Sequence, residues 1–150
     1  MNLLFAYLHH LAAFSLVACL FSQLILLSLP DTPPSTRLLR NIDAAYGLSA
    51  LLLLLAGGLR AGVFEKTWSY YQAQPAFWLK LAGFALAGLL SIYPSLHFFK
   101  RARLTNAELA TPRQIQIKIH LRRIKLGETG LVCLIIWQAI CLAKGINYLN

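Results

Sequence analysis

The chain has 150 residues, of which 58% are hydrophobic and 13% are charged, and its formal net charge is +9. A soluble domain is nearer half apolar and a quarter charged, so the composition excludes an ordinary soluble protein and indicates a single membrane domain, residues 1–150. The basic residues cluster between apolar segments, and no RNA-binding signature or zinc spacing accompanies them. We therefore expect no nucleic-acid partner.

Four apolar segments are long enough to cross a bilayer, which takes about 20 residues. They cover about residues 3–29, 44–62, 77–99 and 124–143. The first stops at LPDTPPSTR, where prolines and polar residues end a helix and begin a loop. Backbone groups in lipid must be satisfied within the chain, and the alternation of a membrane barrel is absent. The prediction is an all-α, integral membrane four-helix bundle.

Small residues on two of these segments indicate close packing between helices. Gly83 and Ala87 form a small-xxx-small pair in the third segment, and Gly57 and Gly58 lie in the second. Such residues let helices approach closely in a membrane. The tandem glycines are equally compatible with loose packing.

The basic residues indicate how the helices are oriented. Arg37 and Arg40 lie in the first loop. The loop at about residues 100–125 carries Lys100, Arg101, Arg103, Arg113, Lys118, Arg122 and Arg123. The positive-inside rule predicts that both loops face the cytoplasm, near anionic headgroups, and that both termini face outward. We expect a multi-pass protein of the bacterial inner membrane, in contact with the lipid bilayer.

The stretch RQIQIKIHLRR within the third loop has two interpretations. Its alternation of apolar and polar residues suggests a strand, whereas Ile117, Leu121 and Ile124 also fit one helical stripe. An isolated strand beside a membrane would have unpaired edges. An interfacial extension of the last helix is therefore the preferred prediction.

Polar residues are predicted at two depths in the membrane, and the first group lies near the outer face. His9 is roughly 9 Å past Leu3 along the first helix, and Lys80 is about 5 Å past Phe77 along the third. Arg60 lies near the outer end of the second segment. Adjacent residues on a helix point about 100° apart, so at most one of His9 and His10 is expected to face squarely into the bundle.

Haem b is the natural cofactor for an inward-facing histidine in a helical bundle. His9 is the expected axial ligand, with His10 as the alternate. Lys80 would be the second ligand or a propionate partner, Arg60 a propionate partner, and Trp78 part of the porphyrin lining. The structural alternatives are histidines hydrogen-bonded between helices and basic residues that reach the headgroups.

A second group is predicted toward the cytoplasm and consists of Gln23, Asp43, Tyr46, His97 and Glu128. Ionisable residues inside a membrane are functional candidates, so Glu128, Asp43 and His97 could form a proton relay. The structural alternative pairs Glu128 with Lys125 or Arg123 near the start of the last helix.

Several stretches together resemble a family of bacterial membrane proteins classed as a domain of unknown function. They are YLHHLAAF, YGLSALLLLLAGGLR and YYQAQPAFWLKLAGFALAGLLSIYP, followed by an acidic residue that opens the last segment. More distantly, the layout is similar to HemJ-type membrane protoporphyrinogen oxidases. His9 matches their histidine in the first span, Lys80 their lysine opening the third, and Glu128 the acid of the last. Their arginine–asparagine–glutamate sequence is absent, with RRIKLGE as a loose substitute.

These observations predict a membrane protein that binds b-type haem or a related porphyrin in its outer half. Electron transfer or porphyrin oxidation would be the reaction, which makes the protein a candidate oxidoreductase. A homo-oligomer is expected, because four short helices bury little of a haem. The alternatives are a small proton-coupled transporter, or a structural or assembly protein without a cofactor.

Overall fold

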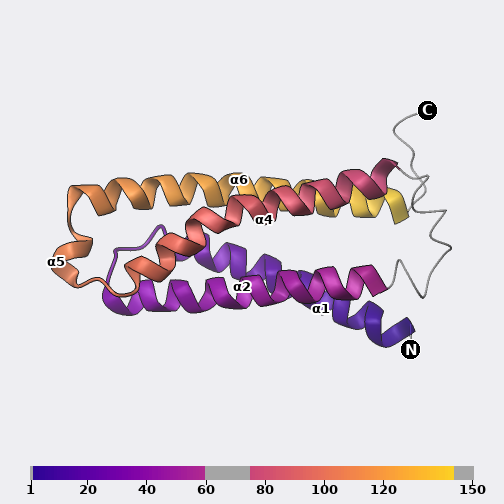
Figure 1. The fold of residues 1–150 in the computed structure, drawn as a ribbon, viewed down its shortest axis with the longest axis horizontal. Coiled ribbons are helices and arrows are strands. Elements are labelled where there is room, and N and C mark those ends of the chain that lie inside the picture. The colour runs from indigo at the N-terminus through magenta and orange to yellow at the C-terminus, as the bar shows by residue number, and fades with distance from the viewer. Residues whose placement is uncertain (1, 60–74, 144–150) are drawn as a thin grey trace.

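The computed structural model describes residues 2–59 and 75–143, and every regular element within them is a helix. In chain order these are α1 (Asn2–Leu26), α2 (Pro33–Leu59), α4 (Pro75–Arg101), α5 (Asn106–Leu109) and α6 (Pro112–Ala143). The long helices run side by side along one axis, and the short α5 lies at one end of them (Figure 1). The predicted all-α class is confirmed.

The long helices pack as two antiparallel pairs, α1 with α2 and α4 with α6. The pairs meet where α2 contacts α4 and where α1 contacts α6. Figure 1 shows the α1–α2 turn and α5 at one end, which we call the basic end (residues 27–32 and 102–111). The start of α1 and the end of α2 lie at the opposite, far end, together with the start of α4.

Away from the basic residues near the start of α2 and in the first part of α6, the outer faces of the long helices are apolar. Leu3, Phe14 and Leu89 are 84%, 73% and 66% exposed, and most other large exposed side chains on the long helices are leucine, isoleucine or aromatic. Extended exposed apolar surface marks contact with another apolar phase. Among the described helices, Leu3–Leu26, Pro33–Leu59 and Phe77–Arg101 are long and apolar enough to cross a membrane.

The second helix begins at Pro33, well before the predicted residue 44. Proline is favoured in the first turn of a helix, because its missing N–H has no partner there in any case. Thr32 and Ser35 support this start: the Thr32 N–H donates to Ser35 Oγ at 2.9 Å, and the Ser35 N–H donates to Thr32 Oγ1 at 3.3 Å. The polar stretch after Pro30 is therefore mostly helix, not loop.

The short helix α5 is absent from the predicted elements, although the sequence carries its signal. Thr105 and Glu108 form a capping box, in which each side chain accepts from the other residue's backbone N–H. The Thr105 N–H and hydroxyl both donate to the Glu108 carboxylate, at 2.7 Å each, and hold the pKa of Glu108 below its ordinary value.

RQIQIKIHLRR lies wholly within α6, so the strand interpretation is wrong and the helical extension is confirmed. Its alternating pattern does not produce a strand, because Ile117 and Leu121 share one helical face toward the core while Ile115 and Ile119 are exposed. Leu121 is fully buried, and Ile117 packs beside it against Leu39 and Phe98. The predicted span at residues 124–143 forms the second part of this continuous helix.

The buried apolar side chains form two layers along the bundle. The first layer, nearer the basic end, consists of Leu27, Leu39, Phe98 and Leu121. The second layer, nearer the far end, consists of Leu16, Leu20, Tyr46 and Val132. The first layer has side chains from the α1–α2 turn, α2, α4 and α6, and the second has side chains from α1, α2 and α6. The helices therefore pack around a common interior at two levels.

Two glycines mark close helix contacts. A methyl group added at Gly83 would lie 3.1 Å from Ile135 Cγ1, and Ala87, one turn later, is buried. The predicted small-residue contact of this helix is therefore confirmed, and its partner is α6. Of the tandem glycines, Gly57 packs against His9, whereas nothing lies within 4 Å of a methyl group at Gly58.

We expect Gly83→Ala to destabilise the bundle by about 1 kcal/mol or more, because the added methyl group overpacks the α4–α6 contact. Gly88→Ala is the matched control on the same helix, since a methyl group there meets nothing within 4 Å. The free energy of unfolding in mixed micelles measures both. Equal stability of the two variants would show that α4 and α6 do not pack closely at Gly83.

Candidate functional site

Polar side chains gather inside the bundle between the two apolar layers. We call this group the buried cluster: Gln23, Asp43, Tyr46, Ser91, Lys125 and Glu128. It draws side chains from α1, α2, α4 and α6. Polar groups are costly to bury unless they are paired, so these side chains must satisfy one another.

Lys125 is the centre of the buried cluster and is fully buried. Its Nζ lies 2.9 Å from Glu128 Oε2 and 3.9 Å from Asp43 Oδ1, and it donates to Ser91 Oγ at 3.2 Å. It also lies 4.6 Å from the centre of the Tyr46 ring and 6.0 Å from that of Phe98. An ammonium over an aromatic face is attracted by the ring's quadrupole, which adds to the ion pairs.

The two carboxyl groups of the cluster have different surroundings. Glu128 is fully buried, and Tyr46 donates its hydroxyl proton to Glu128 Oε1 while Lys125 contacts the other oxygen. Asp43 accepts a hydrogen bond from Gln23 Nε2 at 3.0 Å and stands farther from Lys125. One ammonium therefore faces two carboxyl groups away from solvent, an arrangement that can hold and release a proton.

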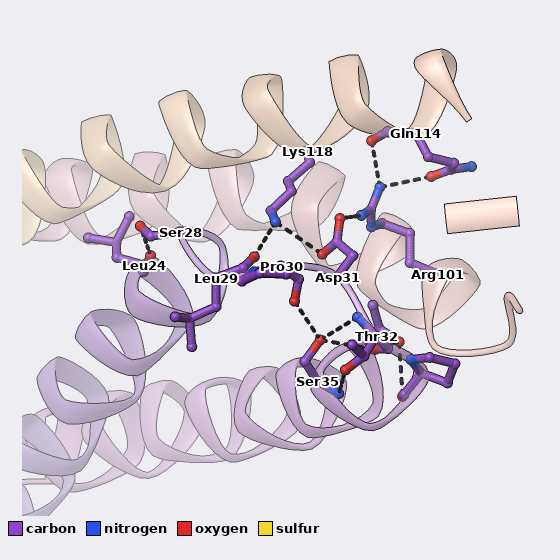
Figure 2. Close-up of polar contacts among 12 residues, drawn as sticks. Leu24, Ser28, Leu29, Pro30, Asp31, Thr32, Ser35, Arg101, Gln114 and Lys118 are labelled. Carbon is purple, nitrogen blue, oxygen red and sulfur yellow. Dashed lines mark hydrogen bonds and ion pairs between the residues drawn. The ribbon is translucent and has the colours of Figure 1, made fainter. Parts of the chain in front are cut away.

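A second polar group closes the basic end and ties three segments together. Arg101, only 2% exposed, donates to Asp31 at 2.6 Å and to the backbone and side-chain oxygens of Gln114 at 2.8 Å each (Figure 2). Lys118 pairs with Asp31 at 3.3 Å and donates to the Leu29 carbonyl oxygen. These contacts, which we call the loop clamp, join the α1–α2 turn to α4 and α6.

The two adjacent histidines point in different directions, as expected from helix geometry. His9 is half-buried and faces α2, where its Cε1 would lie 3.2 Å from a methyl group on Gly57. His10 is exposed, and its Nδ1 lies 2.6 Å from the Ala6 carbonyl oxygen of its own helix. The two rings meet edge to face, with centroids 5.9 Å apart. Only His9 therefore belongs to the bundle interior.

The other residues of the outer group lie on α4 or outside the described ranges. Trp78 is 48% exposed and stacks edge to face with Phe77, and Lys80 is half-buried. Arg60 falls outside the described residues. Because α1 packs mainly against α2 and α6, His9 does not lie on a principal neighbour of the helix that carries Lys80.

The structure brings together four of the five residues predicted toward the cytoplasm: Gln23, Asp43, Tyr46 and Glu128. His97 lies apart, against Tyr93 at a centroid distance of 4.4 Å, and Tyr93 also contacts His120. The sequence predicts Lys125 only as a partner of Glu128 near the start of the last helix. Because α6 already begins at Pro112, Lys125 lies well inside the helix and not near its start. Its spacing of three residues places its side chain on the same helical face as Glu128, which is the sequence signal for its position in the bundle interior.

An apolar cavity of about 90 Å³ extends from Tyr46 toward the far end. It is lined by side chains of all the long helices, among them Leu16, Leu53, Phe84 and Val132. No set of three or more histidine, cysteine or acidic side chains that could hold a metal ion occurs among residues 2–59 and 75–143. The buried cluster is thus the main concentration of interior chemistry that the structure describes.

We expect Lys125→Met to destabilise the protein by about 3–5 kcal/mol, because it leaves the buried Glu128 carboxylate without its cation. Lys100→Met, at an exposed position, should change stability by no more than about 0.5 kcal/mol. Unfolding in mixed micelles compares the two. A similar small loss in both variants would contradict a buried charge at Lys125.

Comparison with known proteins leads to one family. A family model described as "Predicted membrane protein (DUF2214)" matches residues 1–147. No curated protein and no solved structure matches the chain. Because the match covers almost the whole sequence, and the apolar helices agree with it, this protein belongs to the DUF2214 family of predicted membrane proteins.

Proposed function

We propose that this protein is a small proton-coupled transporter of the bacterial inner membrane, with the buried cluster as its proton-binding centre. The observation that carries the proposal is the position of Lys125, Glu128 and Asp43 inside an otherwise apolar bundle. Ionisable groups inside membrane helices are costly and mark proton or ion pathways. A buried ion pair adds little net stability over well-packed apolar residues, so its charges favour a functional role in addition to the structural one.

The proposed topology has four crossings, with both chain ends outside. Three helices are apolar and long enough, and the second part of α6 packs beside α4 as the fourth crossing. The basic end gathers exposed arginines, including Arg37, Arg103 and Arg122. The positive-inside rule places such residues in the cytoplasm, where anionic headgroups attract them.

A transporter must expose its binding centre to one side at a time, and the layers around the cluster support this behaviour. Toward the basic end, the first apolar layer, which contains Phe98, and the loop clamp lie between the cluster and the proposed cytoplasmic side. Toward the far end, the cluster meets the apolar cavity beyond Tyr46. If the contacts of the loop clamp and of the first apolar layer broke together, the cluster would open to the cytoplasmic side while the second layer stayed closed.

We expect the purified protein in liposomes to carry protons when a membrane potential is imposed. A trapped pH-sensitive dye reports the flux. Asp43→Asn should reduce it to the level of protein-free liposomes, because asparagine cannot take up or release a proton. Glu108→Gln is the control, since Glu108 is exposed on α5 and glutamine can keep its capping box. Wild-type flux equal to that of protein-free liposomes would sink the transporter proposal.

Haem binding is the second candidate, and the inward position of His9 beside Gly57 favours it. The interior cavity of about 90 Å³ is far below the 300–1,000 Å³ typical of ligand pockets, and the larger groove of about 270 Å³ between α1 and α2, lined by Leu8 and Ala12 near His9, is also below that range. Haem would therefore have to lie on the outer face or between two copies, with Lys80 and Arg60 as expected partners. The distant similarity to HemJ-type oxidases supports this candidate, and bound haem would supply redox chemistry.

The colour of the detergent-purified protein separates the two candidates. Under the haem candidate, a Soret band appears, His9→Ala removes it, and His10→Ala retains it because His10 points away from the bundle. Titration with added haem provides the second measurement. Colourless protein that takes up no added haem would exclude this candidate and leave the transporter.

A further inference from the structure

The charge balance of the buried cluster requires a proton. Lys125 is its only cation among the described side chains, whereas Glu128 and Asp43 are both carboxyl groups. Lys125 and Glu128 are fully buried and the Asp43 side chain is only 12% exposed, so ionisation of both carboxyl groups would leave a net negative charge largely shielded from water, which is costly. One bound proton makes the cluster neutral, and the hydrogen bonds around each carboxyl group indicate where it resides.

Glu128 has the surroundings of an ionised carboxylate. Lys125 Nζ lies 2.9 Å from one of its oxygens, and the Tyr46 hydroxyl donates to the other. A nearby positive charge and hydrogen bonds to the charged form both favour ionisation. One oxygen of this fully buried side chain thus accepts a hydrogen bond, and the other lies at ion-pair distance from Lys125 without accepting a hydrogen bond from any described residue.

Asp43 has the surroundings of a protonated acid. Its distance from Lys125 Nζ is 3.9 Å, which is 1.0 Å longer than the Glu128 contact. Gln23 is fully buried, and its Nε2 donates to Asp43, yet its Oε1 receives no hydrogen bond from any described residue. Buried polar atoms nearly always have a partner, and the hydroxyl of a protonated Asp43 would supply one.

We infer that Asp43 holds the proton of the cluster and that Gln23 positions it by accepting the Asp43 hydroxyl while donating to the other carboxyl oxygen. The groups facing Asp43 agree with this assignment: Gln23 on α1, Tyr46 on its own helix, Ser95 on α4, and Lys125 and Glu128 on α6. The Ser95 hydroxyl can donate or accept, so it fits either form.

This assignment names the group that takes part in the proposed transport, and to that extent it rests on the proposed function. When the proton leaves the Asp43 oxygen, the carboxylate that remains attracts the ammonium of Lys125 across the 3.9 Å separation. Lys125 would then be shared between Asp43 and Glu128, and the Gln23 amide oxygen would lose its donor. Proton release is thereby linked to movement of α6 against α1 and α2.

Infrared spectroscopy of the full-length protein in liposomes at neutral pH tests the assignment. We expect the carbonyl stretch of a protonated carboxylic acid in the wild type, and its loss in the difference spectrum of Asp43→Asn. Glu128→Gln should lose the band as well, because Lys125 would then take the ionised Asp43 as its counter-charge. The wild-type band is therefore assigned by its shift when aspartate carboxyl groups are labelled with carbon-13, and a shift on labelling glutamate instead would place the proton on Glu128. A band that survives Asp43→Asn, or that is absent from the wild type, would overturn the inference.

Stability provides a second measurement that does not require Glu128→Gln to fold well. Asparagine imitates the protonated acid, because its amide can donate to Gln23 Oε1 and accept from Gln23 Nε2. Asp43→Asn should therefore melt within a few degrees of the wild type, whereas Glu128→Gln, which removes the carboxylate nearest to the buried Lys125, should melt well below it or fail to fold. Equal large losses would show that Asp43 is ionised.

The two measurements also separate this inference from the proposed function. A band that depends on Asp43 in a protein that carries no protons would reject transport and leave the protonated acid in place. Proton flux in a protein without that band would reject the assignment alone. Flux that Asp43→Asn abolishes, together with loss of the band, would support both.

Discussion

The ion pair between Lys125 and Glu128 is the interaction on which the arrangement of the bundle depends. Both side chains are fully buried, so neither has water to solvate its charge. Each must find its partners within the protein, and those partners come from the other long helices: Tyr46 and Asp43 from α2, Ser91 from α4. The depth at which α6 packs is therefore tied to these contacts, because a shift by one turn would leave a buried charge unpaired.

The rest of the molecule isolates this pair. Apolar layers lie on both sides of the cluster, and the loop clamp holds the basic end closed through Arg101 and Asp31. Away from the basic residues, the outer faces are apolar, so the surrounding phase is hydrocarbon and strengthens every electrostatic contact inside. A group that gains or loses a proton inside this apolar interior changes the net charge of the whole buried cluster. We therefore connect the cluster to function.

The two candidate functions occupy different levels of the bundle. The charged cluster lies nearer the basic end, and His9, early in α1, lies toward the far end against Gly57. The apolar cavity separates these levels and carries no charged side chain. Chemistry at one level can thus be altered without directly changing contacts at the other.

The sequence by itself determined the class of the protein, because apolar segments of membrane-crossing length admit only helices. It also indicated that the two basic loops share one end, because successive crossings alternate in direction, and that His9 and His10 point apart, because neighbouring residues on a helix are about 100° apart. The capping signals at Thr32 and Thr105 were present but local, and they decide where α2 and α5 begin. Only the tertiary structure decided that Lys125 is central, that His97 lies apart, and that Gln23 meets Asp43. These outcomes depend on the axial position and rotation of each helix relative to its neighbours. Contacts between residues far apart in the sequence fix both quantities, and the sequence of a single helix does not specify them.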